Sequence, residues 1–382
     1  MYVIEGNRLK ILCWADQIED EALAQARNLA SLPFACRHVA LMPDVHSGYG
    51  MPIGGVLATR DVIVPNAVGV DIGCGMRAVK LPAPAGEVYK KRDALLNDIQ
   101  RSIPTGFNWH KTPQDHPLFK TVPDFPVIRA ELDNARRQLG TLGGGNHFIE
   151  LQKDENNGAW VMIHSGSRNL GKKTCDEYNR LAREKNYYNL PDSWQLWGLP
   201  ADSRPGREYL SAMRFCLDFA RANREHMMKI VLGIMERHLK IETGGPGQID
   251  VHHNYAAVER HGREEFIIHR KGAVRAEGTV IIPGSMGTPS YICRGLQNPD
   301  SFISCSHGAG RIMGRNAARK KYSIESVIKE MRDLDISLYK ANKKDVAEEC
   351  SAAYKDISSV MSQQRDLVEI LLELKPMGVV KG

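Results

Sequence analysis

Residues 70–75, which read VDIGCG, constrain this chain more than any other stretch. Asp71 and Cys74 place a carboxylate and a thiol three residues apart, and the neighbouring glycines allow the backbone to turn tightly. A hard oxygen and a soft sulfur held at one turn indicate a metal site, and a thiolate is able to bridge two cations. The alternative interpretation is a small buried cysteine beside an aspartate that only shapes the turn.

Several histidines elsewhere in the chain stand in glycine-rich or turn-like surroundings. Three glycines at 143–145 precede one of them, and consecutive glycines let backbone amides approach an anion closely. Two others follow the predicted strands 159–163 and 302–306. We predict that these side chains converge with Asp71 and Cys74 in one metal-dependent active site, the histidines being His147, His164, His253 and His307.

Asp44 and His46 lie two residues apart after a short apolar run. In an extended segment, side chains at this spacing point to the same face. The pair is therefore either a second polar part of the site or a turn cap, and the residues alone leave both interpretations open. By the same alternation we expect Asn146 and Glu150 to face one side of a strand and His147 the other.

The composition is that of a globular protein, and the chain is long enough for one large domain or two ordinary ones. A net charge of only +6 does not by itself indicate nucleic-acid binding. The 8 cysteines form no CxxC pair and the N-terminus has no secretory leader, which predicts a reducing cytoplasm rather than a disulfide framework. No apolar run is long enough to predict a membrane span.

Helical and strand patterns alternate along the chain in a way that is typical of a mixed α+β fold. Helical patterns occupy 19–32, 87–103, 129–139, 172–185 and 208–239, another helix is expected to start near 311, and a further helical stretch is expected at 368–374. Strands are expected at 38–42, 148–151, 159–163, 266–268, 279–282 and 302–306, and an irregular loop or lid at 105–127. We predict one catalytic domain, 1–382, with β-sheets flanked by helices and a helical insertion at about 172–240.

Four predicted strand ends carry polar side chains, namely His164, Lys271, Ser285 and His307. Strand ends in a layered fold commonly meet at a cleft. A cleft with carboxylate, thiolate, imidazoles, glycine amides and cations suits phosphoryl or nucleotidyl transfer, because cations neutralise the phosphate oxygens. His307 is our candidate nucleophile, since it lies beside glycines and Arg311. Zinc hydrolysis and a histidine-rich structural site are the alternatives that the residues leave open.

Taken together and in order, the motifs resemble the signature set of the RtcB family of RNA ligases. They cover roughly residues 40–315 and stand at 43–46, 71–75, 143–148, 164–168, 253–254, 270–273, 283–288 and 307–311. The resemblance implies an RtcB-like fold and a GTP- and manganese-dependent ligase. Such an enzyme joins RNA ends with a 3′-phosphate or 2′,3′-cyclic phosphate to a 5′-hydroxyl end, in tRNA splicing or RNA repair. The implied partner is RNA with these ends, while an activating protein and the oligomeric state are left open.

The resemblance also implies the metal ligands. Cys74 would bridge two Mn²⁺ ions. Asp71 and His147 would complete the protein shell of one ion, and His164 and His253 would complete that of the other.

The nucleotide roles come from the same resemblance. His307 would attack the α-phosphate of GTP and carry GMP as a phosphoramidate, which then activates the RNA 3′-phosphate. Within the motifs, the implied guanylate contacts are Asn146, Glu150, Ser285, Ser290, Ala309 and Arg311. A C-terminal tail at 354–382 would add Tyr354 and Lys381.

The softness of the sulfur and imidazole donors would by itself suggest zinc rather than manganese. Manganese therefore enters through the resemblance, and we expect zinc to bind tightly and inhibit. Two other functions fit the same motifs. One is a paralogue that guanylylates 3′-phosphate ends without efficient ligation, and the other is a non-catalytic protein that binds nucleic-acid ends in the same basic cleft.

Overall fold

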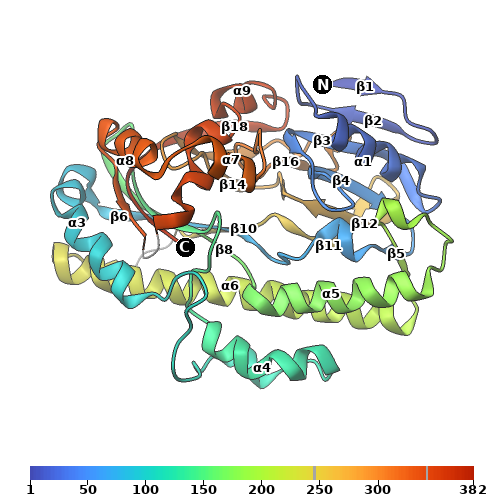
Figure 1. The fold of residues 1–382 in the computed structure, drawn as a ribbon, viewed down its shortest axis with the longest axis horizontal. Helices are drawn as coiled ribbons and strands as arrows, with labels where there is room; N and C mark the ends of the chain where they lie inside the picture. Colours follow the sequence, from blue (N-terminus) through green and yellow to red (C-terminus); the bar gives the residue numbers. More distant parts are fainter. Residues whose placement is uncertain (244–246, 341–342) are drawn as a thin grey trace.

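The computed structural model describes residues 1–243, 247–340 and 343–382, and helices and strands are mixed throughout this part of the chain (Figure 1). Two large sheets lie side by side, and long helices run along one side of both (Figure 1). The α+β class expected from the sequence, with sheets flanked by helices, is confirmed. Among the described residues no helix combines the length and the apolar character that a membrane crossing requires.

The larger sheet has eight strands. In spatial order they are β10 (Ile249–His252), β6 (Gly75–Pro84), β8 (Gly158–Ser165), β7 (Phe148–Asp154), β18 (Val368–Lys381), β15 (Ser290–Gly295) and β14 (Thr279–Ile282), with β17 (Ser337–Tyr339) beside β18. All pairs are antiparallel except β17 with β18. Strand β10 at one end of this order also contacts β14 at the other end, so the sheet curls toward a barrel.

The second sheet has six strands and contains the N-terminus. Its order is β1 (Tyr2–Ile4), β2 (Lys10–Cys13), β3 (Ala35–His46), β4 (Ile53–Thr59), β12 (Glu264–Lys271) and β11 (Asn254–His261). Two small pairs complete the strands, β13 (Ala273–Arg275) with β16 (Ser304–Ser306) and β5 (Val62–Ile63) with β9 (Leu199–Pro200). Both large sheets therefore mix strands from the first and second halves of the chain.

The helices of the described chain cover the sheets and fill the connections. They are α1 (Asp20–Ser31), α2 (Pro65–Val68), α3 (Ala85–Ser102), α4 (Pro126–Gln138), α5 (Arg168–Lys185), α6 (Arg204–Leu239), α7 (Arg315–Lys321), α8 (Ile324–Asp333) and α9 (Ile357–Ser362). Short 3-10 turns lie at Pro117–Lys120, Asp192–Trp194, Pro299–Ser301, Lys343–Glu349 and Ser351–Ala353. The 36-residue helix α6 joins two cores: its first half packs with α4 and α5, and its second half packs with α3 and the larger sheet.

Two local expectations from the sequence are wrong. Residues 368–374 form the first half of strand β18 and not a helix, because they pair with β15 in the larger sheet, and tertiary pairing overrides helical composition. The basic helix expected to start near 311 begins at Arg315, so Arg311 is not on its face. Arg311 instead forms an isolated antiparallel bridge with Tyr354.

Candidate active site

The loop that carries Asp71 and Cys74 connects α2 to β6 and passes directly against helix α6. At Gly73 the backbone has φ +73°, and a Cβ there would lie 2.9 Å from the Cβ of Ala220 on α6. Only glycine allows this close approach. Arg224 of α6, fully buried, donates hydrogen bonds to the carbonyl oxygens of Gly73 (3.0 Å) and Ser165 (2.9 Å). The helix therefore fixes the loop beside the end of strand β8.

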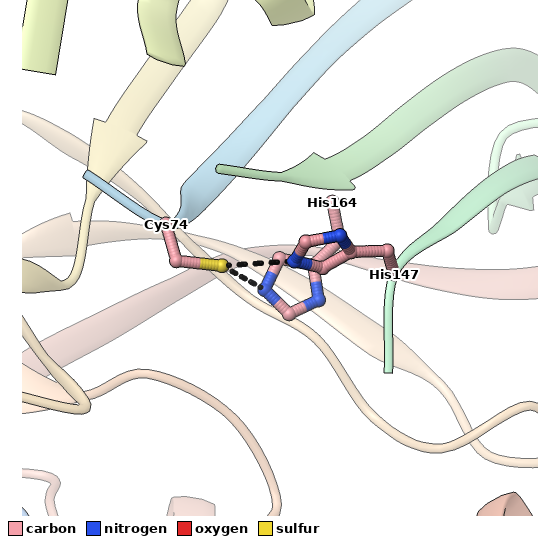
Figure 2. A group of neighbouring side chains, drawn as sticks. All are labelled: Cys74, His147 and His164. Carbon is pink, nitrogen blue, oxygen red and sulfur yellow. Dashed lines mark hydrogen bonds between the residues drawn. The ribbon is translucent and has the colours of Figure 1, made fainter. Parts of the chain in front are cut away.

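Two histidines of the larger sheet meet the thiol of this loop (Figure 2). His147 directly precedes β7 and His164 lies near the end of β8. The Sγ atom of Cys74 is 3.4 Å from Nε2 of His147 and 3.2 Å from Nε2 of His164. All three residues are buried, and their ligand atoms lie within 4.8 Å of one another, as a metal-binding group requires.

His253 and Asp71 extend this group on its two sides. His253 lies between β10 and β11, and its Nε2 atom is 3.4 Å from Nε2 of His164. The carboxylate of Asp71 lies 3.6 Å from Nε2 of His147. The structure thus brings together the five side chains that the family resemblance implied as metal ligands.

Burial governs the charge state of the group. It lowers the pKa of His164 and of His253 well below the usual value for histidine, so both imidazoles are neutral near pH 7. Burial also raises the pKa of the Cys74 thiol well above its usual value, and the charge of Asp71 adds to this. Desolvation would raise the pKa of Asp71 as well, but the adjacent His147, followed by Cys74, outweighs it and lowers that pKa to about 2.

The donor set fits divalent cations. Nδ1 of His147 lies 2.9 Å from the carbonyl oxygen of Leu142, and Nδ1 of His164 lies 3.3 Å from that of Asn146. Because a carbonyl only accepts, each Nδ1 carries the proton and each Nε2 turns a lone pair toward Cys74. Converging lone pairs, a thiol and a carboxylate in a buried space are electron donors that a metal ion would satisfy.

His307 stands next to this group, just after β16. Its ring centroid is 4.9 Å from that of His253, and its Nδ1 atom is hydrogen-bonded to Oδ2 of Asp44. Burial would raise the pKa of Asp44, but the charge of His307 and this hydrogen bond outweigh it and hold the pKa below its usual value. A Cβ at Gly310 would lie 2.3 Å from the backbone oxygen of Asp44, so glycine is needed where the two segments meet.

A pocket opens on the other side of His307. Its volume is about 800 Å³ including the open space at its mouth. The pocket joins loops from both large sheets to the end of β18. Among its lining residues are Asn146, Glu150, His164, Ser285, His307, Ala309, Arg311, Tyr354 and Lys381.

Comparison with known proteins decides which family this arrangement belongs to. A family model described as "tRNA-splicing ligase RtcB" matches residues 25–125 and 120–382. The chain belongs to the RtcB family. It is 38% identical over 391 residues to "RNA-splicing ligase RtcB1" of Escherichia coli ATCC 25922, with 96% of this chain and 95% of the relative covered. It is 33% identical to "tRNA-splicing ligase RtcB" of Nanoarchaeum equitans, with 95% and 92% covered.

Most of the site residues expected from the RtcB family lie close together, but not all of them line the pocket. Ser290 is absent from the pocket lining and lies behind it, where its hydroxyl accepts hydrogen bonds from the Gly284 amide and the Gln152 side chain, both at 3.2 Å. The expected cation Lys271 lies elsewhere, because its ammonium donates to the backbone oxygens of Tyr49 and Asn66.

Several residues that line or support the site in this RtcB chain had no definite role predicted from the sequence. Asp44 was left open between a site role and a turn cap, and the structure places it in strand β3 against His307. Glu349 carries no motif, because it is one acid within a charged segment. Arg315, Phe148 and His46 also line the pocket, although the sequence gave none of them a definite role there.

Proposed function

We propose that this chain is an RtcB-type RNA ligase that joins a 3′-phosphate or 2′,3′-cyclic phosphate RNA end to a 5′-hydroxyl end through a guanylated histidine. The observation that carries the proposal is the position of His307, which lines the pocket and packs against His253 of the Cys/His group. His307 therefore lies between the pocket and the Cys/His group. From there it could attack a nucleotide that is held in the pocket while cations at the Cys/His group neutralise the phosphates.

We assign two Mn²⁺ ions to the Cys/His group. Asp71, Cys74 and His147 would hold one ion. Cys74, His164 and His253 would hold the other, so that the thiolate is shared. When bound, the ions neutralise phosphate oxygens and make the phosphorus more open to in-line attack.

The residues of the chain supply the nucleophile and its orientation. Asp44 accepts a hydrogen bond from Nδ1–H of His307, which keeps the ring proton on Nδ1 and leaves a lone pair on Nε2. Nε2 attacks the α-phosphorus of GTP, an N–P bond forms, and pyrophosphate leaves. The RNA 3′-phosphate then attacks the same phosphorus, takes GMP and frees His307. The 5′-hydroxyl finally attacks the 3′-phosphorus, a phosphodiester forms and GMP leaves. A cyclic phosphate end is first opened to a 3′-phosphate by water.

We assign the guanylate to the pocket beside His307. Its wall offers carboxylate, amide, hydroxyl and ammonium groups in a largely buried space, which is the mixture that fixes a nucleotide. Ser290 would act from behind through the Gly284 amide. The proposed contacts that line the pocket are Asn146, Glu150, Ser285, Ala309, Arg311, Tyr354 and Lys381.

Two features of the whole chain belong to this proposal. We take residues 1–382 as one catalytic domain, with a helical insertion at about 172–240 and a nucleotide-side tail at 354–382. The eight cysteines are free thiols, which supports a reducing compartment such as the cytoplasm. The RNA substrate would come from tRNA splicing or RNA repair, and an activating protein remains open as a further partner.

Labelled GTP tests the proposal directly. Incubation with α-labelled GTP and Mn²⁺ should give a covalent adduct on the wild-type chain and none on His307→Ala. Adding RNA with 3′-phosphate and 5′-hydroxyl ends should then give joined product. A guanylylating paralogue would yield activated ends without joining, and a non-catalytic binder would form no adduct at all. An adduct that persisted in His307→Ala would place the nucleophile elsewhere.

A further inference from the structure

We propose that Glu349 is a positioning residue that holds Lys381 and Tyr354 for guanine recognition and thereby sets a preference for GTP over ATP. The inference deepens the proposed function and rests on it, because it takes the pocket beside His307 to be the guanylate pocket.

Glu349 gathers hydrogen-bond donors from three separate segments. It lies at the end of the 3-10 turn Lys343–Glu349 and is only 2% exposed. Its Oε2 atom accepts hydrogen bonds from the Tyr354 hydroxyl at 2.7 Å and from the Lys381 ammonium at 3.2 Å. Its Oε1 atom accepts from Nη1 of Arg311 at 3.2 Å. One buried carboxylate therefore contacts three of the expected guanylate residues, Arg311 from the motifs and Tyr354 and Lys381 from the C-terminal tail.

The carboxylate is anionic in this surrounding. Burial would raise the pKa of Glu349, but the charge of Lys381 and the hydrogen bond from Tyr354, followed by the charge of Arg311, outweigh it and hold the pKa below its usual value. A buried charge with several hydrogen-bonded partners keeps those partners in place, and removing one member leaves the others uncompensated. Glu349 is thus the centre of the cluster and not a peripheral member.

Arg311 is mainly committed to the protein. A guanidinium has five N–H donors. Nε donates to the Met313 oxygen, Nη2 donates to the Glu348 backbone oxygen, and Nη1 donates to both Glu349 and the Tyr354 hydroxyl. These four hydrogen bonds leave Arg311 one donor for a ligand. Its main role is to brace the Glu349 side of the pocket.

Lys381 is better placed to contact a base. An ammonium has three donors, and among the described residues the Lys381 ammonium donates to Glu349 alone. The same nitrogen lies 5.6 Å from the ring centroid of Phe148, another pocket residue. Glu349 therefore fixes the ammonium in the pocket wall and leaves donors for a ligand.

Guanine and adenine differ in hydrogen-bonding chemistry, so an ammonium held at the position of Lys381 would favour GTP over ATP. Guanine presents the acceptor O6 where adenine presents the donor N6–H₂. An ammonium donates and cannot accept, so it binds guanine at this edge and opposes adenine. If Glu349 loses its charge, the Lys381 ammonium is no longer held there and this discrimination weakens.

The experiment compares Glu349→Gln with wild type by the rate of adduct formation with labelled GTP and labelled ATP. We expect the KM for GTP to rise about tenfold or more and the GTP-to-ATP ratio of kcat/KM to fall about tenfold, because one partner of a buried charge pair is lost. The kcat at saturating GTP should change less than about threefold, since Asp44 and His307 are untouched. Glu348→Gln is the matched control. Its carboxylate is also buried, but it faces Arg319 at 3.5 Å and does not line the pocket, so both values should stay at wild type.

A second variant covers the case in which Glu349→Gln folds poorly. Lys381→Met should lower the GTP-to-ATP ratio by itself, and the double variant, which removes both charges, should lower it no further than Lys381→Met. A folded Glu349→Gln with unaltered KM and nucleotide preference, or a double variant with additive losses, would overturn the inference while the proposed function stood. A wild-type chain that formed no adduct with either nucleotide would contradict both.

Discussion

The Oδ2 atom of Asp44 lies 2.6 Å from Nδ1 and 3.0 Å from the backbone nitrogen of His307. One carboxylate oxygen therefore fixes both the ring and the main chain of the proposed nucleophile. Because Asp44 is on β3 of the six-stranded sheet and His307 follows β16, the contact also ties the two segments together. The tautomer of His307 follows from this contact, since the carboxylate accepts a hydrogen bond from Nδ1–H and Nε2 is then left unprotonated.

Asp44→Asn tests that dependence. The amide can donate to Nδ1 and so favour the tautomer with its proton on Nε2, which cannot attack phosphorus. We expect the single-turnover rate of adduct formation with labelled GTP to fall about 10²-fold or more. Asp61→Asn, at an exposed position, is the control. A rate within threefold of wild type would remove Asp44 from the mechanism.

Cys74→Ala tests the shared metal ligand. Loss of the sulfur takes a donor from both proposed ions, so we expect the bound metal to fall from about two ions per chain to less than one. Elemental analysis after dialysis against Mn²⁺ measures this. Cys36→Ala removes a partly exposed thiol outside the group and should leave the metal content unchanged. Equal metal content in both variants would contradict a bridging thiolate.

Metal substitution separates affinity from activity. The sulfur and imidazole donors favour zinc, whereas the proposed chemistry uses manganese. We expect metal-stripped protein to form the guanylate adduct with Mn²⁺, and added Zn²⁺ to displace it and stop the reaction. Adduct formation supported by Zn²⁺ alone would show that the expected inhibition is wrong.

Glu150 should make stability depend on pH. Burial raises its pKa to about 8 from 4.5 in a model peptide, against the opposing effects of the Gln152 hydrogen bond and the charge of Lys381. The folded state then binds a proton that the unfolded state has lost, so this contribution to the free energy of unfolding is full below pH 4.5 and disappears as the pH rises through about 8. Urea titrations at several pH values across this range give the free energy of unfolding at each pH. We expect it to fall less steeply with rising pH in Glu150→Gln than in wild type. Parallel profiles would contradict the raised pKa.

Arg224→Met tests the support that α6 gives to the metal loop. Besides Gly73 and Ser165, Arg224 binds the Asp250 carboxylate at 2.6 Å. The methionine would leave that acid without this partner, and we expect a loss of about 3–5 kcal/mol in the free energy of unfolding and weaker metal binding. Arg221→Met on the same helix is exposed and should change neither. Unchanged metal affinity in a destabilised Arg224→Met would restrict Arg224 to a structural role.

The parts of the site that sequence analysis found are those with local patterns. Polar residues directly after apolar runs, as at His164 and His307, identified strand ends, and the structure brings those two ends to the same place. Gly73, Gly75 and Gly310 were informative because each stands where an added Cβ would collide with a neighbouring segment. Such patterns lie within a few consecutive residues, so they can be recognised without knowing which distant segment packs against them.

The parts that the sequence did not give depend on contacts between distant segments. The stretch 368–374 has helical composition, and only its pairing with β15 makes it a strand. No local sequence pattern identifies Glu349. Its role depends on hydrogen-bond donors from distant segments, namely Lys381 at the end of β18 and Arg311 at the bridge with Tyr354. Lys381 became a candidate through family resemblance alone, for the same reason.

The position of strand β18 has a consequence for folding during synthesis on the ribosome. It stands between β7 and β15, which would otherwise be two open edges in the larger sheet. Residues 148–154 and 290–295 are synthesised long before residues 368–381, so a nascent chain must wait with those edges unpaired. Neither the sheet nor the pocket wall at Lys381 closes until this strand is made, so the proposed nucleotide site is completed last.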